Sequence, residues 1–381
     1  MKIFIKISAL ITFLALFIAP LQAFAQDNSI GKVSASSACL MDADSGKLLY
    51  SKNADKRLPM ASTTKVMTAI VALESGIPLD TVVKVPREAV GVEGSSVYLA
   101  EGERITLEAL LYSLLLSSAN DASVAIAVAV AGSIEAFVDM MNEKAELIGL
   151  CNTHFSNPHG LDSNEHYTTA RELAKIMAYS SKNEEFMRIC GTYKTVIPKQ
   201  DDGTRVLINH NRLLKIDERV IAGKTGFTKK SGRCLVTLAE RDGLRLISVT
   251  LNAPNDWSDH TSLYDFGFSN YKRVRLESIS LTLPVVSGNK KSITVSSIEE
   301  PSLLIQSELT DNIEVKIYAP RFLFAKINKG DEIGKAVYVC NGRIMASCTL
   351  YACEDVMQER YRFSLFEWLN NILKGFIKWK R

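Results

Sequence analysis

The chain changes its hydrophobic pattern near Lys272. Before this residue, apolar positions recur at three- and four-residue spacing in runs of helical length, with β-like runs between them. From Arg273 onward, short segments alternate apolar and polar positions and are separated by glycine turn signals. We therefore expect a mixed helix-and-strand domain over residues 26–272 and a small all-β sandwich over residues 273–357.

Three helical runs are expected in the first region. Residues 62–74 place apolar side chains on one face and are followed by Gly76, which favours a helix end. Strongly apolar runs over 110–116 and 122–131 predict two core helices joined by a polar turn. In the second region the alternation predicts strands over 278–283, 292–295, 313–317 and 337–340.

Both ends of the chain differ from its middle. Residues 1–25 have a basic start, a short apolar core and Ala23-Phe24-Ala25, which predicts a cleaved signal peptide rather than a retained anchor. Within the tail over 358–381, residues 363–381 place aromatic and aliphatic side chains on one half of a helical wheel and basic ones on the other. This predicts a helix on the outer surface of the cytoplasmic membrane. A helix packed on its own β domain is the alternative.

Composition narrows the classes of function. The formal net charge of +3 falls to +1 when Lys2 and Lys6 leave with the signal peptide, so nothing suggests nucleic acid. Seven cysteines in an exported chain leave at least one unpaired. Cys39 and Cys340 lie in β-like alternation and are expected to be buried, and the spacing of the later cysteines does not suit zinc.

The string Ser62-Thr63-Thr64-Lys65 opens the first expected helix. Positions i and i+3 share a helix face, so the Lys65 amine should lie beside the Ser62 hydroxyl. Lysine is a base near neutral pH only if burial or positive neighbours lower its pKa. A similar string at Ser287 lies in a turn, where serine and lysine have no fixed relation. We expect Ser62 to be a nucleophile and Lys65 its base.

The string Ser118-Ala119-Asn120 occupies the polar break between the two core helices. Buried polar groups are unfavourable there unless they are hydrogen-bonded or take part in function. A capped turn with Asn120 or Asp121 as N-cap is the alternative.

The string Lys224-Thr225-Gly226 closes a β-like run over 219–223. Glycines at 223 and 226 allow another backbone to approach, and such a strand edge can pair with an extended peptide. Lys230-Ser231-Gly232 is better explained as a hairpin turn into residues 233–240. The three strings together, in this order, are typical of an acyl-serine active site.

With these strings the chain resembles the low-molecular-mass penicillin-binding D-alanyl-D-alanine carboxypeptidases. The resemblance extends to residues 58–61 before the nucleophile, to an Ω-type loop over 152–162 and to residues 223–228. It implies an α/β (α+β) β-lactamase/transpeptidase-like catalytic domain with a mostly antiparallel sheet, followed by the small β-sandwich.

The resemblance also implies roles for individual residues. Ser62 would be acylated, Lys65 would take its proton, Ser118 would relay protons and Asn120 would contact the substrate peptide. The substrate would be bound by Lys224, Thr225, Gly226 and Phe227. Of these, Lys224 and Thr225 would contact its terminal carboxylate. The backbone N–H groups of Ser62 and Phe227 would form the oxyanion hole.

Two departures limit the transfer, and His159 is a separate case. Some relatives have histidine where this chain has Phe227, although only the backbone N–H is needed. Some relatives bind the carboxylate with an arginine beyond the next strand, where this chain has residues 255–260 without one, so we assign no arginine. His159 in the Ω-type loop is expected to stabilise the loop rather than to order a water for deacylation.

The expected reaction is removal of the terminal D-alanine from peptidoglycan stem peptides, without a metal or organic cofactor. β-Lactams should acylate Ser62, because they imitate the D-Ala-D-Ala unit. The alternatives are a D,D-endopeptidase acting on cross-links, a β-lactamase and a non-catalytic peptidoglycan-binding protein. The region 156–169 has no Glu-x-x-Leu-Asn, which speaks against a β-lactamase.

Overall fold

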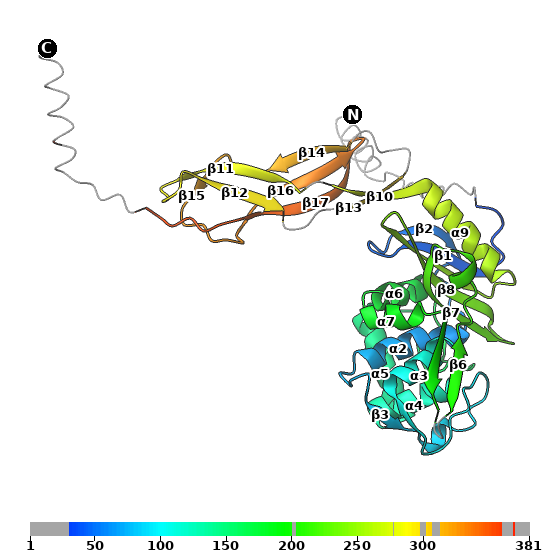
Figure 1. Ribbon diagram of the computed structural model, residues 1–381. Helices are drawn as coiled ribbons and strands as arrows, with labels where there is room; N and C mark the ends of the chain where they lie inside the picture. The colour runs from blue at the N-terminus through cyan, green and yellow to red at the C-terminus, as the bar shows by residue number, and fades with distance from the viewer. Residues whose placement is uncertain are drawn as a thin grey trace, which may run out of the picture. The chain divides into compact units, whose positions relative to one another are not determined.

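A computed structural model describes residues 30–199, 203–276, 278–297, 302–306, 313–359 and Leu369. The described chain forms two compact units (Figure 1). The first runs to Arg241 and resumes over Arg245–Gly267, and the second contains Asp242–Leu244 and the chain from Phe268 onward. The expected signal peptide and, apart from Leu369, the expected membrane helix over 363–381 lie outside the described residues.

The first unit is built on a five-stranded sheet whose strand order is β2-β1-β9-β8-β7. Its pairs β1–β2, β1–β9 and β7–β8 are antiparallel, as expected. The strands are β1 (Ser37–Asp42), β2 (Leu48–Lys52), β7 (Val220–Thr228), β8 (Gly232–Arg241) and β9 (Leu244–Leu251). The strand β7, which carries Lys224-Thr225-Gly226, therefore lies at an edge of the sheet.

Helices cover both faces of this sheet (Figure 1). The Sγ of Cys39 contacts the carbonyl of Ala170, at the start of α6 (Ala170–Ser180). On the other face, a Cβ at Gly267 in α9 (Asp256–Asn270) would lie 2.7 Å from a methyl group of Leu40. Successive strand residues point to opposite faces, so β1 is packed between these two helices.

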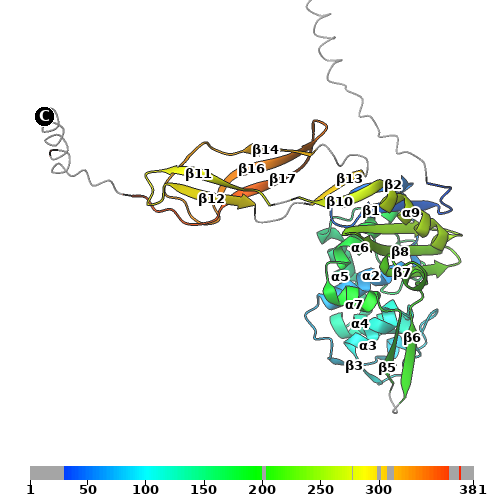
Figure 2. The same ribbon diagram turned by 45° about the horizontal axis from the view of Figure 1, so that its top comes forward.

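The helical part of the unit surrounds α2 (Lys65–Leu73), which contacts α3 (Leu107–Leu115), α4 (Asn120–Ala131), α5 (Ile134–Leu147), α6 and α7 (Glu184–Cys190). The two expected core helices are present as α3 and α4, and α4 ends at Gly132 with φ +81°. The remaining elements are η1 (Ala61–Thr64), β3 (Val82–Lys84), η2 (Arg87–Ala89), β4 (Arg104–Thr106), β5 (Lys194–Pro198), β6 (Thr204–Ile208) and α8 (Leu213–Ile216). The hairpin β5–β6 projects beside α3 and α4 in Figure 2.

The second unit is all β, as expected. A six-stranded sheet has the order β14-β16-β17-β12-β11-β15, and β10 pairs with β13 in a separate sheet. Its strands are β10 (Tyr271–Arg275), β11 (Ser280–Val286), β12 (Ser292–Ser297), β13 (Ser302–Gln306), β14 (Ile313–Tyr318), β15 (Leu323–Phe324), β16 (Glu332–Cys340) and β17 (Arg343–Ala352). All four expected strands are found, whereas β10, β13, β15 and β17 were not anticipated.

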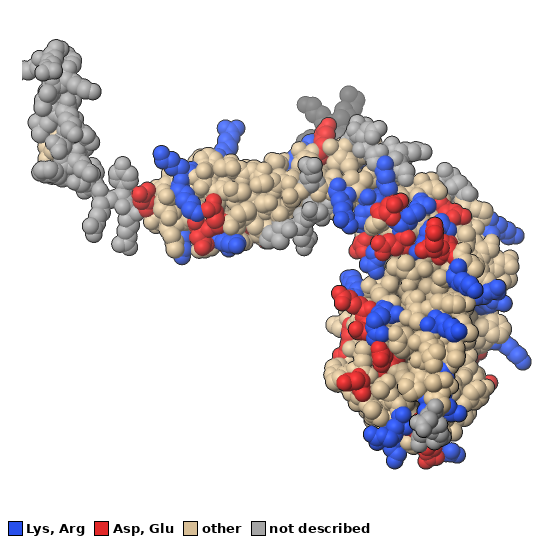
Figure 3. Space-filling model, in the orientation of Figure 1, with Lys and Arg blue, Asp and Glu red and all other residues tan. Residues whose placement is uncertain are grey.

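Several surface and core features bear on function. Basic and acidic side chains are interspersed over the face shown in Figure 3.

All seven cysteines are described and carry free thiols: Cys39, Cys190, Cys234 and Cys340 are buried, whereas Cys151 and Cys353 are exposed. No single helix of the described chain is long and apolar enough to cross a membrane, although α4 and α5 together have the length and composition while bending by 85°.

Candidate active site

The nucleophile string starts in a tight turn rather than in the regular helix that we expected. Residues Ala61–Thr64 form a 3₁₀ turn, and α2 begins only at Lys65. Ala61 adopts φ +47°, a left-handed conformation that is uncommon for a residue with a side chain. The expected proximity is nevertheless present, because Lys65 Nζ lies 2.9 Å from Ser62 Oγ.

Lys65 is fully buried and has three hydrogen-bond acceptors around its amine. Besides Ser62 Oγ, the Nζ atom donates to Asn120 Oδ1 and to the carbonyl of His159, both at 2.7 Å. Burial, followed by the positive charge of Lys224, lowers the pKa of Lys65 well below its ordinary value. A lowered pKa favours the neutral amine, which is the form that can take a proton from Ser62.

The string Ser118-Ala119-Asn120 joins α3 to α4 without capping the second helix. The N-cap of α4 is Ala119, and it makes no side-chain cap hydrogen bond, so the alternative of an Asn120 or Asp121 cap is wrong. Ser118 has φ +58° and lies at the cleft, whereas Asn120 is buried and holds Lys65. The Asp121 carboxylate accepts the N–H groups of Val97 and Leu99 and thereby holds the loop that carries Ser95.

The strand β7 lies close to the nucleophile turn at Gly226. A Cβ at this position would lie 2.9 Å from the backbone nitrogen of Ser62 and 3.0 Å from the carbonyl oxygen of Met60, so a side chain would push the turn away. Lys224, two residues earlier, is fully buried and donates from Nζ to the carbonyl of Thr225. Burial lowers the pKa of Lys224 to about 7.

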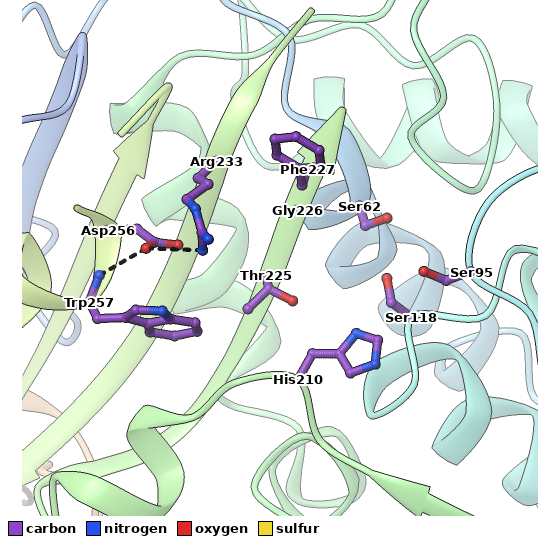
Figure 4. Close-up of a pocket in the computed structure, with 10 residues that line it drawn as sticks. All are labelled: Ser62, Ser95, Ser118, His210, Thr225, Gly226, Phe227, Arg233, Asp256 and Trp257. Atoms are coloured by element: carbon purple, nitrogen blue, oxygen red, sulfur yellow. Dashed lines mark hydrogen bonds and ion pairs between the residues drawn. The ribbon is translucent and has the colours of Figure 1, made fainter. Parts of the chain in front are cut away.

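These elements enclose a cleft of about 380 Å³ (Figure 4). Five of its lining residues were expected at the site: Ser62, Ser118, Thr225, Gly226 and Phe227. Five were not: Ser95, His210, Arg233, Asp256 and Trp257. Lys65, Asn120 and Lys224 do not line the cleft, because they lie buried behind its surface.

One arginine lines the cleft, Arg233 at the start of β8, outside residues 255–260 where the sequence analysis found none. Arg233 stands opposite Phe227 in the β7–β8 register. The sequence did indicate that Arg233 lies at the cleft. A hairpin turn was expected just before residue 233, and such a turn brings residue 233 opposite residue 227.

The Ω-type loop contacts the nucleophile turn through its backbone. The carbonyl of His159 accepts a hydrogen bond from Lys65, and the carbonyl of Pro158 accepts one from Thr68 Oγ1 at 2.6 Å. A Cβ at Gly160, which has φ +92°, would lie 2.0 Å from the carbonyl oxygen of Ala61. The imidazole Nδ1 of His159 accepts the N–H of Leu161, and burial lowers its pKa to about 4, so this ring is neutral and bonded within its loop.

His166 was missed by the sequence analysis. Its Nδ1 accepts the backbone N–H of Ser156 at 3.0 Å, so Nε2 carries the proton and donates to Thr64 Oγ1 at 2.7 Å. Thr64 Oγ1 in turn donates to the carbonyl of Ala61 at 2.8 Å. We call this chain of hydrogen bonds from His166 through Thr64 to Ala61 the turn clasp.

Among the described residues, no group of three or more His, Cys, Asp and Glu side chains is placed to hold a metal ion.

Comparison with known proteins identifies the family. Residues 22–255 match the model of the peptidase family S11, described as D-alanyl-D-alanine carboxypeptidase. The chain belongs to this family. Residues 268–358 match the C-terminal domain of penicillin-binding protein 5. The expected activity, that of a serine-type D-alanyl-D-alanine carboxypeptidase that processes peptidoglycan and is acylated by β-lactams, is confirmed at this level.

Individual carboxypeptidases resemble the chain over most of its length. D-alanyl-D-alanine carboxypeptidase DacF of Bacillus subtilis is 35% identical over 333 residues, which cover 84% of this chain and 86% of that protein. D-alanyl-D-alanine carboxypeptidase DacA of Haemophilus influenzae is 30% identical and covers 97% of this chain and 99% of its own. A crystal structure of penicillin-binding protein 5 from H. influenzae superposes with a TM-score of 0.74 at 29% identity, covering 86% of this chain and 99% of that one. The expected fold class is confirmed.

Proposed function

We propose that Ser62 is the nucleophile of this carboxypeptidase and Lys65 its general base. The observation that carries the proposal is the buried amine of Lys65, 2.9 Å from Ser62 Oγ, with a lowered pKa. Ser62 Oγ attacks the carbonyl carbon of the penultimate D-alanine while its proton passes to Lys65 Nζ. Asn120 and the His159 carbonyl hold the amine in place.

The backbone N–H groups of Ser62 and Phe227 form the oxyanion hole in this proposal. The close approach of Gly226 to the Ser62 nitrogen supports it, because this contact brings the backbone of β7 beside that of the nucleophile turn. When the tetrahedral intermediate collapses, the C–N bond breaks and the leaving nitrogen receives a proton from Lys65 through Ser118. Water then hydrolyses the Ser62 ester and releases the shortened peptide.

The edge of β7 supplies the remaining contacts to the peptide. β7 is the last strand in the sheet order, and no further strand of the described sheet pairs with its free edge. An extended stem peptide can therefore pair with this edge through its main chain. The hydroxyl of Thr225 points into the cleft between β7 and Ser118 (Figure 4). It is placed to accept or donate a hydrogen bond with the substrate's end.

Peptide mapping tests the proposed nucleophile directly. The wild-type protein is incubated with a penicillin, digested and sequenced by mass spectrometry, and we expect the acyl group on the peptide that contains Ser62. Product analysis on a pentapeptide should show release of D-alanine. An acyl group on Ser118 or Ser95 instead would overturn the assignment.

The same reagents separate the alternative functions. A D,D-endopeptidase would also release products from a cross-linked dimer, a β-lactamase would hydrolyse penicillin with rapid turnover, and a non-catalytic binding protein would form no acyl-enzyme. The family assignment favours the carboxypeptidase, and the endopeptidase remains the alternative that uses the same residues.

We further propose that the protein is exported through residues 1–25 and held at the outer face of the cytoplasmic membrane by residues 363–381. The amphipathic pattern and the +3 charge of this tail support the proposal, since both suit a surface of anionic lipid. Deleting residues 363–381 should release an active enzyme from liposomes that contain anionic lipid. A full-length protein that never binds these liposomes, or a truncated one that unfolds, would contradict it.

A further inference from the structure

His210 lines the cleft from a segment that is held between two walls of the site. The residue follows β6, and its backbone N–H donates to the carbonyl of Leu116 at 3.1 Å, two residues before Ser118. On the other side, a Cβ at Gly223 in β7 would lie 2.7 Å from Nδ2 of the adjacent Asn211. His210 therefore lies between the turn that carries Ser118 and the strand β7.

Two buried asparagines keep this segment in place. Nδ2 of Asn209 donates to the carbonyls of Cys190 and Thr192, at 3.2 Å and 3.0 Å. Oδ1 of Asn209 accepts the backbone N–H of Asn211 at 2.9 Å. Both asparagines are buried, whereas His210 between them is exposed. The segment thus presents an imidazole to the cleft on a backbone that its neighbours hold.

The His210 ring and the Ser118 hydroxyl are both available for a ligand. Figure 4 shows the ring pointing into the cleft between Thr225 and Ser118. Within the described chain, neither the ring nor Ser118 Oγ has a hydrogen-bond partner. Partial burial, followed by the positive charges of Lys224 and Lys65, lowers the pKa of the ring. The ring is therefore neutral at pH 7, and one of its nitrogens can accept a hydrogen bond.

The other titratable groups near the cleft already have partners. Asp256, the one carboxylate that lines the cleft among the described residues, accepts the backbone N–H of Trp257 at 3.1 Å and lies 3.7 Å from Nη1 of Arg233. Lys65 lies behind the cleft surface, with its amine bonded to Ser62 Oγ and to two further acceptors. The imidazole is therefore the available proton acceptor on the described cleft surface.

We propose that His210 is a catalytic residue of deacylation, which accepts a proton from the water that hydrolyses the Ser62 ester. The proposal rests on the proposed function of Ser62 and adds a group that acts only in its second step. We assign Ser118 to the proton that the leaving nitrogen receives, so departure of the amine frees a position beside Ser118. A water there can donate to the His210 ring and accept from the Ser118 hydroxyl.

The hydrolytic step balances with these groups alone. The water oxygen bonds to the ester carbonyl carbon while one water proton passes to the unprotonated nitrogen of His210. When the tetrahedral intermediate collapses, the C–O bond to Ser62 breaks, and this proton passes through the Ser118 hydroxyl to Ser62 Oγ. The peptide leaves as a carboxylic acid. Acylation does not need His210, because Lys65 already lies 2.9 Å from Ser62 Oγ.

Separate measurement of the two steps tests the proposal. His210→Gln keeps a polar side chain that cannot take the proton, so deacylation should slow by about 10²- to 10⁴-fold, the usual contribution of a general base. Acylation of Ser62 by penicillin, followed by stopped flow, should be unchanged. With a pentapeptide substrate, intact-mass analysis should find more acyl-enzyme at steady state in the variant than in the wild type.

Two readouts distinguish a base from a structural side chain. Water attack requires neutral His210, so the acid limb that this ring gives to the wild-type deacylation profile should be lost in His210→Gln. Hydroxylamine attacks as a neutral amine without a base, and it should release the peptide from the acylated variant as fast as from the wild type. Arg212→Gln, which changes an exposed side chain of the same segment, should alter neither step.

The possible failures have different meanings. Unchanged deacylation in His210→Gln, or equal slowing of acylation and deacylation, would overturn the proposal. Hydroxylamine release that slows as much as hydrolysis would also overturn it, because the ring would then only position the ester. Failure of the wild-type enzyme to form an acyl-enzyme on Ser62 would instead overturn the proposed function.

Discussion

The helix side of the cleft buries the polar groups of Lys65 and Asn120, whereas the strand side exposes Phe227 and Arg233 although it buries Lys224. The helix side consists of the starts of α2 and α4, where Lys65 and Asn120 are buried and hydrogen-bonded to each other. The strand side consists of β7, β8 and the start of α9, where Phe227 is 66% exposed and Arg233 has one distant ionic partner.

This difference separates chemistry from recognition. Proton transfer requires heavy atoms within hydrogen-bond distance and an amine kept free of water, and the helix side provides both. Recognition requires donors that are still available when substrate arrives, and the strand side provides these. Substitutions on the helix side should therefore reduce the rate on every substrate, whereas substitutions of the exposed side chains on the strand side should reduce it selectively.

The largest effect is expected from Ser62→Ala. Loss of a serine nucleophile typically lowers kcat by about 10⁶-fold, and covalent labelling by fluorescent penicillin should disappear with it. Intact-mass analysis measures the label, and Ser95→Ala, which removes another hydroxyl of the cleft, is the matched control. Stoichiometric penicillin on the Ser62→Ala protein would exclude Ser62 as the nucleophile.

A backbone substitution on the strand side should come second. Phe227→Pro removes the N–H that we assign to the oxyanion hole, and the loss of one such donor lowers kcat by about 10²- to 10³-fold. Phe227→Ala keeps this N–H and removes only an exposed ring, so its rate should stay within about threefold of wild type. Similar losses in both variants would mean that the ring, not the N–H, contributes to turnover.

The turn clasp should have an intermediate effect. Thr64→Val and His166→Phe each break the path to the Ala61 carbonyl, and the freed turn should slow acylation by about 10- to 100-fold, the range for a buried polar group left unpaired. Because both variants break one chain of hydrogen bonds, the double variant should lose little more than either alone.

Stopped-flow acylation by penicillin measures this effect, and His154→Ala is the control from the same loop. The His154 ring hydrogen-bonds to the carbonyl of Glu165 rather than to Thr64 or Ala61. Losses that multiply in the double variant, or that follow the melting temperature across the series, would show that the clasp only stabilises the fold.

The smallest effect is expected from Lys224→Met, and it should appear in the pH profile. The positive charge of Lys224 lowers the pKa of Lys65, so its removal should raise that pKa. The acid limb of the acylation profile should therefore move to higher pH. Since the pKa of Lys224 is itself lowered to about 7, the difference from wild type should be greatest below pH 7.

Substrate choice then distinguishes the two roles of Lys224. If Lys224 acts through Lys65, Lys224→Met should lose activity equally on free and amidated D-alanine ends. An unmoved acid limb with a loss confined to the free carboxylate would instead support the direct contact that the family resemblance implies.

Local spacing explains which parts of the site could be predicted from the sequence. Ser62 and Lys65 are three residues apart, so a single turn brings them together, and the break that holds Ser118 is marked by apolar runs on both sides. The all-β unit was also expected from its alternation, but β17 (Arg343–Ala352) was missed because its polar and apolar residues do not alternate regularly.

The remaining contacts of the site join residues that are far apart in the sequence, so local spacing could not predict them. His166 reaches Thr64 across 102 residues of sequence, and only the folded Ω-type loop brings them together. Predicting that Arg233 lies at the cleft required the register of the β7–β8 hairpin, which the expected turn implied. Lys224 was expected at the substrate, yet the depth of its burial follows from the packing of α7 on β7.

The arrangement of the thiols has a consequence for survival in an oxidising compartment. Cys190 contacts the carbonyl of Gly223, and Cys234 lies opposite Gly226 in the neighbouring strand, so both thiols adjoin the strand that lines the cleft. Burial raises the pKa of each to about 11, which keeps them as unreactive thiols. Oxidants and alkylating probes should therefore modify Cys151 and Cys353 first, and an enzyme labelled there should still hydrolyse its substrate.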